Sequence, residues 1–337
     1  MTRTPRPSGG PDRDHDSPGG VVVFAPAPLL TITIEAGRSG GDVHVHAGGQ
    51  GIWQARMLAA LGADVTICAS FGGETGRVAR TLLLDEGFRV VGVDREDANA
   101  TYVHDRRDGE RSPVVETDDP PLSRHELDEL YAITIRESMA ADVVLLSGPA
   151  GDDVLPADTY RRLAADLEAF ECLVIADLAG ERLSSALAGG LDLVKTSHEE
   201  LVEDDRIDET EKDDEGAIAE AMRRLSEEGA ETVIVSRASD GVLALVDGAL
   251  LRVTTPDMEV VDTKGAGDSL TAGVAATLAR DAADVRRAIV VGAAAGALNV
   301  TRHGLGTGEA STIIAFADHV EVTELDAPHG SGTEKED

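Results

Sequence analysis

The sequence predicts an α/β protein built on one doubly wound, mostly parallel sheet with a small β lid. Short, continuously apolar segments alternate with helical segments along the chain. Strands of this kind are buried on both faces, so they indicate a parallel sheet covered by helices. An early β excursion with hairpin signals interrupts the alternation. No long linker divides the 337 residues, which fit one large domain and its tails.

The predicted domain spans residues 21–325, with a tail on either side. Residues 1–20 and 326–337 are poor in apolar side chains, so we expect both tails to be disordered. The lid is assigned to about 29–47 and 98–116, where an Asp108-Gly109 turn separates two strand-like segments.

The first half of the domain alternates strands and helices. Helices are expected at 52–61 and 77–86, because glycine follows each as a natural C-cap. Strands are expected at 21–24, 31–35, 65–69 and 90–93.

The second half continues the alternation. A helix at 122–139 is indicated by Ser123 followed by Glu126, a capping box. Apolar strands are expected at 143–147, 173–177, 191–195 and 232–236, a hairpin at 242–253, and helices at 266–280 and 285–299.

Composition narrows the possible functions. Acidic residues outnumber basic ones 63 to 30, a formal net charge of −33. This excludes ordinary binding of nucleic acid or anionic membranes, since both need a basic surface. High acid content, only four lysines and 3% aromatic residues are typical of a protein from a salt-accumulating halophile. A merely acidic protein of a mesophile is the alternative.

Neither a signal peptide nor a membrane span is visible in the sequence. The apolar run 21–25 is too short for the core of a signal peptide, and no run approaches the roughly 20 residues of a span. Cys68 and Cys172 lie in apolar runs outside any motif, so we expect them to be buried and reduced. We therefore expect a cytoplasmic protein.

One segment carries recognisable chemistry, VVDTKGAGDSLTAG at 260–273. Gly265 and Gly267 let the backbone approach a ligand, and the first-turn N–H groups of the following helix favour a phosphate. Asp268 lies in that turn and could accept a proton from an attacking hydroxyl. A glycine-rich turn with an ordinary helix-start acid is the alternative.

The whole segment resembles the second signature of the PfkB (ribokinase-like) family of carbohydrate kinases. The resemblance implies that Asp268 is the catalytic base and that Gly265, Ala266 and Gly267 form an anion hole, with Asp262 opening the signature. It also implies the ribokinase-like fold, and ATP and Mg²⁺ as cofactors.

Further segments extend the resemblance over nearly all of residues 21–325. Residues 47–76 resemble the first family signature, residues 194–201 a Lys-Pro-Asn-x-x-Glu-Leu motif, and residues 234–245 a strand near ATP. The implied substrate residues are Gly48, Gly49, Gln50, Trp53 and Arg56. The implied nucleotide residues are Lys195, Ser236, Gly241 and Asn299, and Glu200 would act on magnesium indirectly, through the Mg-phosphate network.

The nearest subgroup is the sugar-phosphate kinases, such as 1-phosphofructokinase and tagatose-6-phosphate kinase, in a halophilic-archaeal form. The chain departs from this subgroup at the sugar end. The Asn-Pro-Ala-x-Asp segment that grips sugar hydroxyls is Ala-Pro-Ala-Pro-Leu at 25–29, the signature Lys is Gln50 and the signature Asn is Trp53. The Asn of the magnesium motif is Ser197. These changes indicate a working kinase with an altered substrate, although Trp53 could equally be a core residue.

Arginines gather on the predicted lid. Arg106, Arg107 and Arg111 lie in one turn, and guanidinium forks suit a substrate phosphate that the lid could cover. The alternative is a solvated turn balanced by its own acids.

These observations predict ATP- and Mg²⁺-dependent phosphorylation of the primary hydroxyl of a sugar phosphate. Ribose 1-phosphate, giving ribose 1,5-bisphosphate, is preferred because the bulky Trp53 and the lost Asp of the segment at 25–29 suit a smaller ring. Fructose 1-phosphate, giving fructose 1,6-bisphosphate, is the alternative, followed by a nucleoside or sugar kinase and a regulator without turnover. The expected partners are these small molecules, without nucleic acid or membrane, and a homodimer could form through the lid.

Overall fold

The computed structural model describes residues 19–37, 40–170, 172–259, 261–301 and 308–325. Within them, a ten-stranded sheet runs in the order β14-β13-β12-β11-β10-β9-β8-β1-β4-β5. The strands from β11 to β5 are parallel, and the edge from β11 to β14 is antiparallel. The predicted mostly parallel sheet is therefore confirmed. The strands are β1 (Gly20–Phe24), β4 (Asp64–Gly72), β5 (Arg89–Arg95), β8 (Val143–Ser147), β9 (Leu173–Asp177), β10 (Leu191–Ser197), β11 (Ala230–Ser236), β12 (Val242–Val246), β13 (Ala249–Thr254) and β14 (Glu321–Leu325).

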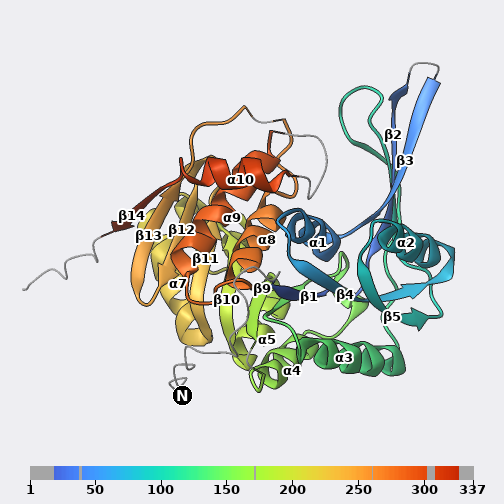
Figure 1. The fold of residues 1–337 in the computed structure, drawn as a ribbon, viewed down its shortest axis with the longest axis horizontal. Helices are drawn as coiled ribbons and strands as arrows, with labels where there is room; N and C mark the ends of the chain where they lie inside the picture. The colour runs from blue at the N-terminus through green and yellow to red at the C-terminus, as the bar shows by residue number, and fades with distance from the viewer. Residues whose placement is uncertain (1–18, 38–39, 171, 260, 302–307, 326–337) are drawn as a thin grey trace, which may run out of the picture.

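Helices cover both faces of the sheet (Figure 1). Along β1, Val21 and Val23 belong to one apolar core, while Val22 and Phe24 belong to the other. This alternation explains why the strands are apolar at every position. One face carries α1 (Gln50–Ala60), α8 (Ala266–Leu278), α9 (Val285–Asn299) and α10 (Ala310–Ala317). The other carries α3 (Arg124–Ser138), α4 (Asp158–Leu167), α5 (Gly180–Gly189), α6 (His198–Glu203) and α7 (Glu215–Glu228).

A separate four-stranded sheet, in the order β3-β2-β6-β7, projects from the main body at the right of Figure 1. It comprises β2 (Leu29–Gly37), β3 (Gly40–Gly48), β6 (Thr101–Asp105) and β7 (Ser112–Glu116), and α2 (Gly73–Asp85) packs against β2 and β3. These strands come from the two segments that the sequence assigns to the lid. That this sheet acts as a lid stays a prediction.

Buried polar contacts join the lid to the main sheet. Asn99 accepts a 2.7 Å hydrogen bond from the Gly72 amide and donates to the carbonyl oxygens of Pro28 and Ser70. Beside it, Arg95 and Asp119 form an ion pair of 3.3 Å in which each side chain is 1% exposed. The base of the lid is thus fixed by directional contacts.

Several boundaries differ from the predicted ones. Gly20, which was assigned to the N-terminal tail, begins β1 and pairs with Asp64. Gly19, of the same predicted tail, is buried and accepts a hydrogen bond from the Asp64 amide, so the order of these two residues differs from the prediction. Residues 1–18 and 326–337 of the predicted tails lie outside the described residues. Helix α1 begins at Gln50, two residues early, because Gly49 at φ 105° provides the N-cap. The capping box of Ser123 and Glu126 is present at the start of α3, as predicted.

The burial of the cysteines and the character of the helices can be compared with the sequence predictions. Cys68 and Cys172 are both buried, as expected. Among the helices of the described segments, none has the length and apolar character needed to cross a membrane.

Candidate active site

Helix α8 starts at the carboxyl edge of the parallel sheet, and its first turn carries the signature glycines. Gly265 is the N-cap residue at φ 76°, a left-handed conformation that favours glycine. A Cβ added at Gly267 would lie 2.7 Å from Lys195 Nζ. The conformation of Gly265 therefore favours glycine, and Gly267 packs closely against the Lys195 ammonium. N–H groups of this turn that lack an intrahelical partner can receive an anion.

Asp268 lies in the same turn and is half-buried. Burial raises the pKa of its carboxyl to about 7, the charges of Asp177 and Glu200 add to the rise, and Lys195 partly opposes it. A carboxyl group that titrates near neutrality is suited to take a proton from a substrate hydroxyl. The placement and the chemistry both fit a general base.

A buried ion pair lies beside Asp268. Lys195 Nζ is 3.3 Å from Asp177 Oδ1, at the end of β9. Burial disfavours the charged lysine, but the charges of Asp177, Glu200 and Asp268 outweigh burial and raise its pKa. The ammonium is therefore a permanent cation directly beneath Gly267. Lys195, expected at the nucleotide, thus lies beneath the predicted anion hole.

Glu200 and Ser197 form the capping box of α6. Ser197 Oγ accepts from the Glu200 amide at 3.1 Å, and Glu200 Oε2 accepts from the Ser197 amide at 2.7 Å. Ser197 is therefore the N-cap residue of α6. Glu200 also lines a cleft of about 1040 Å³, together with Gln50, Gly148 and Asp177; Asp268 is not among the lining residues.

Carboxylate oxygens such as those of Glu200 suit Mg²⁺, which usually takes one or two carboxylates and completes its shell with water and phosphate oxygens. Across the described residues no three acidic, histidine or cysteine side chains gather as a metal site. The residues present therefore fit magnesium held mainly by a nucleotide, with Glu200 nearby.

The other predicted nucleotide residues make local structural contacts. Ser236 Oγ donates to the Thr196 carbonyl oxygen at 3.4 Å, and Asn299 Nδ2 donates to the Lys264 carbonyl oxygen at 2.8 Å. Gly241 has φ 79°, and a Cβ there would lie 2.4 Å from the Val253 carbonyl oxygen. Asn299 therefore supports the loop before α8, and the contacts of all three residues with a nucleotide stay predictions.

The first signature lies where β3 meets α1. Gln50 Oε1 accepts from the Gly148 amide at 2.9 Å, and the Gly49 carbonyl oxygen accepts from the Trp53 amide. Gly48 lies against Thr31 of the neighbouring strand, where a Cβ would come 2.6 Å from its hydroxyl oxygen. Trp53 is half-buried, and its Nε1 is buried without a hydrogen-bond partner in the described structure.

The four arginines separate into two groups. Arg106 lies 3.7 Å from Asp262, in the loop before α8. Arg111 is half-buried, and burial together with the nearby charge of Arg106 lowers the pKa of its guanidinium. Arg107, by contrast, is paired with Asp105 at the exposed turn. Arg56 forms two 2.7 Å hydrogen bonds with Glu86. Arg56 and Arg107 thus already have carboxylate partners, and the expectation that they bind substrate stays a prediction.

The sequence reading missed four buried residues of this network. Gln54 and Thr271 both donate to Asp177 Oδ2, at 2.9 and 2.7 Å, and Ser147 donates to Gln54. Asp177 and Ser147 each end an apolar parallel strand, where ligand sites of such sheets lie, and this signal could have found them. Gln54 gave no local signal.

A glycine-lined helix N-terminus, a buried cation beneath it and a carboxyl group titrating near pH 7 define a phosphotransferase site on an α/β sheet. The sequence matches the pfkB family of carbohydrate kinases over residues 33–312. The chain belongs to this family and is a sugar kinase.

Three named relatives show which kinds of sugar kinase the chain is similar to. The chain is 30% identical over 316 residues to a 1-phosphofructokinase of Haloferax volcanii, covering 90% of this chain and 98% of the relative. It is 27% identical to a 1-phosphofructokinase of Bacillus subtilis, covering 78% and 84%. It is 30% identical to the ATP-dependent 6-phosphofructokinase isozyme 2 of Escherichia coli, covering 76% and 82%.

A comparison with solved structures agrees with the family assignment. The crystal structure of phosphofructokinase-2 from Escherichia coli in complex with potassium superposes with a TM-score of 0.77 at 24% identity, covering 89% of this chain and 98% of that one. This similarity establishes the ribokinase-like α/β fold.

Proposed function

We propose that the protein is an ATP-dependent kinase that phosphorylates the free primary hydroxyl of fructose 1-phosphate, giving fructose 1,6-bisphosphate and ADP. The observation that carries this proposal is Asp268 at the glycine-lined N-terminus of α8, above the Lys195 ammonium. The two 1-phosphofructokinase relatives support the choice of acceptor.

The site residues perform the transfer as follows. Asp268 accepts the proton of the acceptor hydroxyl, whose oxygen forms a bond to the γ-phosphorus as the bond to the ADP oxygen breaks. The N–H groups of Gly267 and Asp268 and the positive charge of Lys195 stabilise negative charge on the moving phosphoryl group. Magnesium, held with the nucleotide near Glu200, would neutralise charge on the phosphates.

Arg106 and Arg111 are the residues that we assign to the phosphate of the acceptor. Two guanidiniums held close together repel each other, and an anion between them relieves that repulsion. Asp262 now occupies part of the Arg106 fork at 3.7 Å, a distance too long for a hydrogen bond. A phosphate dianion can replace this weak contact with charge-assisted hydrogen bonds.

The ribose 1-phosphate prediction has no support. It depended in part on Trp53 shortening the sugar site, but Trp53 is not among the residues that line the described cleft. The named relatives favour fructose 1-phosphate, the alternative of the sequence analysis.

An ADP-release screen in molar KCl tests the acceptor. It compares fructose 1-phosphate, fructose 6-phosphate, ribose 1-phosphate, free fructose and a nucleoside. We expect the highest kcat/KM with fructose 1-phosphate and a large loss with free fructose. Equal turnover of free fructose would contradict an anion site, and a preference for another phosphate ester would contradict only the acceptor proposed.

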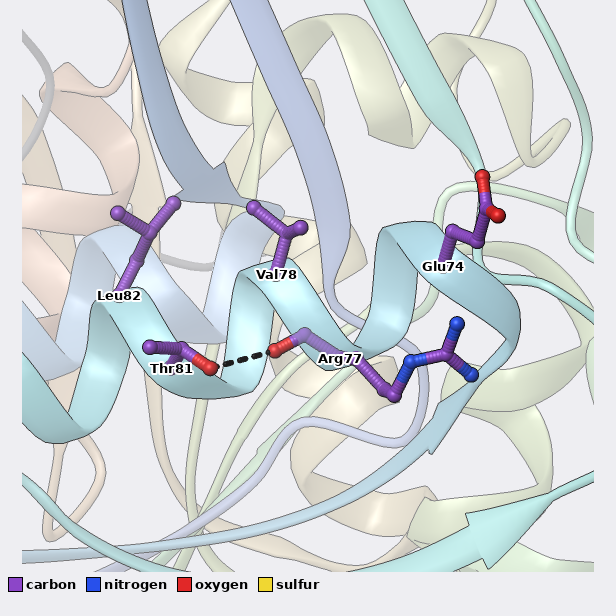
Figure 2. Close-up of a pocket in the computed structure, with 5 residues that line it drawn as sticks. All are labelled: Glu74, Arg77, Val78, Thr81 and Leu82. Atoms are coloured by element: carbon purple, nitrogen blue, oxygen red, sulfur yellow. Dashed lines mark hydrogen bonds between the residues drawn. The ribbon is translucent and has the colours of Figure 1, made fainter.

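We further propose a homodimer through the lid. Val43, Val45 and Val115 are 62%, 42% and 50% exposed, an unusual apolar surface for so acidic a chain. Beside the lid, Val78 and Leu82 point to the same side of α2 and line a shallow depression (Figure 2). Replacing Val43 and Val45 by Asp should give a monomer in analytical ultracentrifugation, whereas Met139→Asp, at another exposed apolar site, should not. A dimer that persists in the lid variant would contradict this interface.

We place the enzyme in the cytoplasm of a salt-accumulating organism. The net charge of −33 supports this setting, and so does the extended similarity to a relative from Haloferax volcanii.

A further inference from the structure

Gln54 of α1 contacts both carboxyl groups of the site. Its Nε2 donates to Asp177 Oδ2 at 2.9 Å and lies 3.4 Å from Asp268 Oδ1. The side chain is 0% exposed, so bulk water cannot replace these contacts. An amide in this place is unexpected if its only role is to fill the core, because burying an amide costs free energy unless it is hydrogen-bonded.

A hydroxyl fixes the orientation of this amide. Ser147 Oγ donates to Gln54 Oε1 at 2.5 Å, which leaves the NH₂ group facing the two carboxyl groups. The reverse orientation would set the amide oxygen against two acceptors, an unfavourable arrangement. Ser147 ends β8, so the sheet itself determines which end of the amide meets Asp268.

The two carboxyl groups are held differently. Asp177 accepts hydrogen bonds from Lys195, Thr271 and Gln54, which makes it the fixed member of the pair. The one side-chain hydrogen bond described for Asp268 is the long one from Gln54 to Oδ1.

We propose that Gln54 is a positioning residue for phosphoryl transfer: its amide bridges Asp177 to Asp268 and holds Oδ1 inward, so that Oδ2 faces the acceptor hydroxyl. This inference rests on the proposed role of Asp268 as the base. A donor between two carboxyl groups also offsets their mutual repulsion, and its hydrogen bond lowers the pKa of Asp268.

The test compares Gln54→Met, which keeps the length but removes the donor, with Leu58→Ala, a cavity-forming change at another fully buried position of α1. For each, kcat is measured against pH with ATP and fructose 1-phosphate, or the best acceptor of the screen, alongside the KM for ATP and the melting temperature in molar KCl. In Gln54→Met the acid limb of kcat should move up by about one pH unit, the expected effect of one lost hydrogen bond to a charged group. Its kcat at pH 7 should fall about tenfold or more while the KM for ATP changes little.

Leu58→Ala should lower the melting temperature without moving the acid limb. If Gln54→Met behaves like Leu58→Ala, Gln54 only packs and the proposal is wrong. Should Gln54→Met not fold, Ser147→Ala, which removes the hydroxyl that holds Gln54 Oε1 and so loosens the amide donor, must shift the limb in the same direction; an unchanged limb would overturn the proposal.

Asp268→Asn is measured in parallel. Near-normal turnover in that variant would contradict the proposed function itself, because the base of the reaction would lie elsewhere. If Asp268→Asn loses turnover while Gln54→Met and Ser147→Ala keep the wild-type dependence of kcat on pH, only the proposed role of Gln54 would be wrong.

Discussion

At the scale of single residues, the ionisation of Asp268 sets the expected pH dependence. The carboxyl can accept a proton only when ionised, and its pKa is raised to about 7. Because this pKa lies near 7, the carboxyl becomes protonated, and activity is lost, as the pH falls below neutrality. We expect kcat to fall about tenfold per pH unit below this pKa, measured from pH 5 to 9 in molar KCl. A kcat that stays constant down to pH 5 would contradict a base of this kind.

Arg106 and Arg107 are adjacent residues that should respond differently to the same change. Arg106 is half-buried and faces the loop before α8, whereas Arg107 is 57% exposed and paired with Asp105. Arg106→Ala should lower kcat/KM for the sugar phosphate about 10- to 100-fold, the effect of losing a charge-assisted contact. Arg107→Ala serves as the matched control and should change kcat/KM less than about twofold. Equal effects of the two substitutions would show that Arg106 has no special role.

The sequence could identify only part of the site at this scale. Asp268 and its glycines lie in one continuous segment whose chemistry is readable. Gln54 and Asp177 are 123 residues apart, and nothing in either local sequence indicates that they meet. The partner of Arg56, Glu86, lies 30 residues away in the sequence, so their ion pair could not be predicted from the local sequence either.

At the scale of elements, the buried ion pair at the base of the lid should dominate its stability. Asp119→Asn leaves Arg95 charged and buried without a counter-charge, which should cost about 3–5 kcal/mol of unfolding free energy. Arg95→Met should cost less, because Asp119 can take up a proton: burial raises its pKa to about 6. Denaturant unfolding in molar KCl measures both, and the double variant should recover most of the loss. Equal costs for the two single variants would contradict this asymmetry.

The sequence predicted most elements because strand and helix periodicities differ strongly in this chain. Continuous apolar runs identified the parallel strands, and α9 begins and ends at the predicted residues 285 and 299. Strand β14 was missed because Glu321–Leu325 is acidic and mostly exposed, so it has neither pattern. It forms an edge strand through backbone hydrogen bonds with β13.

At the scale of the whole molecule, the net charge of −33 should make folding depend on salt. Unscreened repulsion among carboxylates destabilises the compact state, and at 1 M salt the screening length falls to about 3 Å. The melting temperature should therefore rise steeply from dilute buffer to molar KCl, as followed by circular dichroism. A melting temperature independent of KCl would contradict the halophilic assignment.

Turnover by Asp268→Asn is the most direct measurement of phosphoryl transfer at α8. Asparagine keeps the shape of the side chain but cannot accept the proton, so kcat should fall by at least about 10². ATP affinity, measured by calorimetry in the same buffer, should be unchanged because the anion-binding N–H groups remain. Near-normal kcat in a variant that binds ATP normally would show that Asp268 is not the base and that the site works in another way.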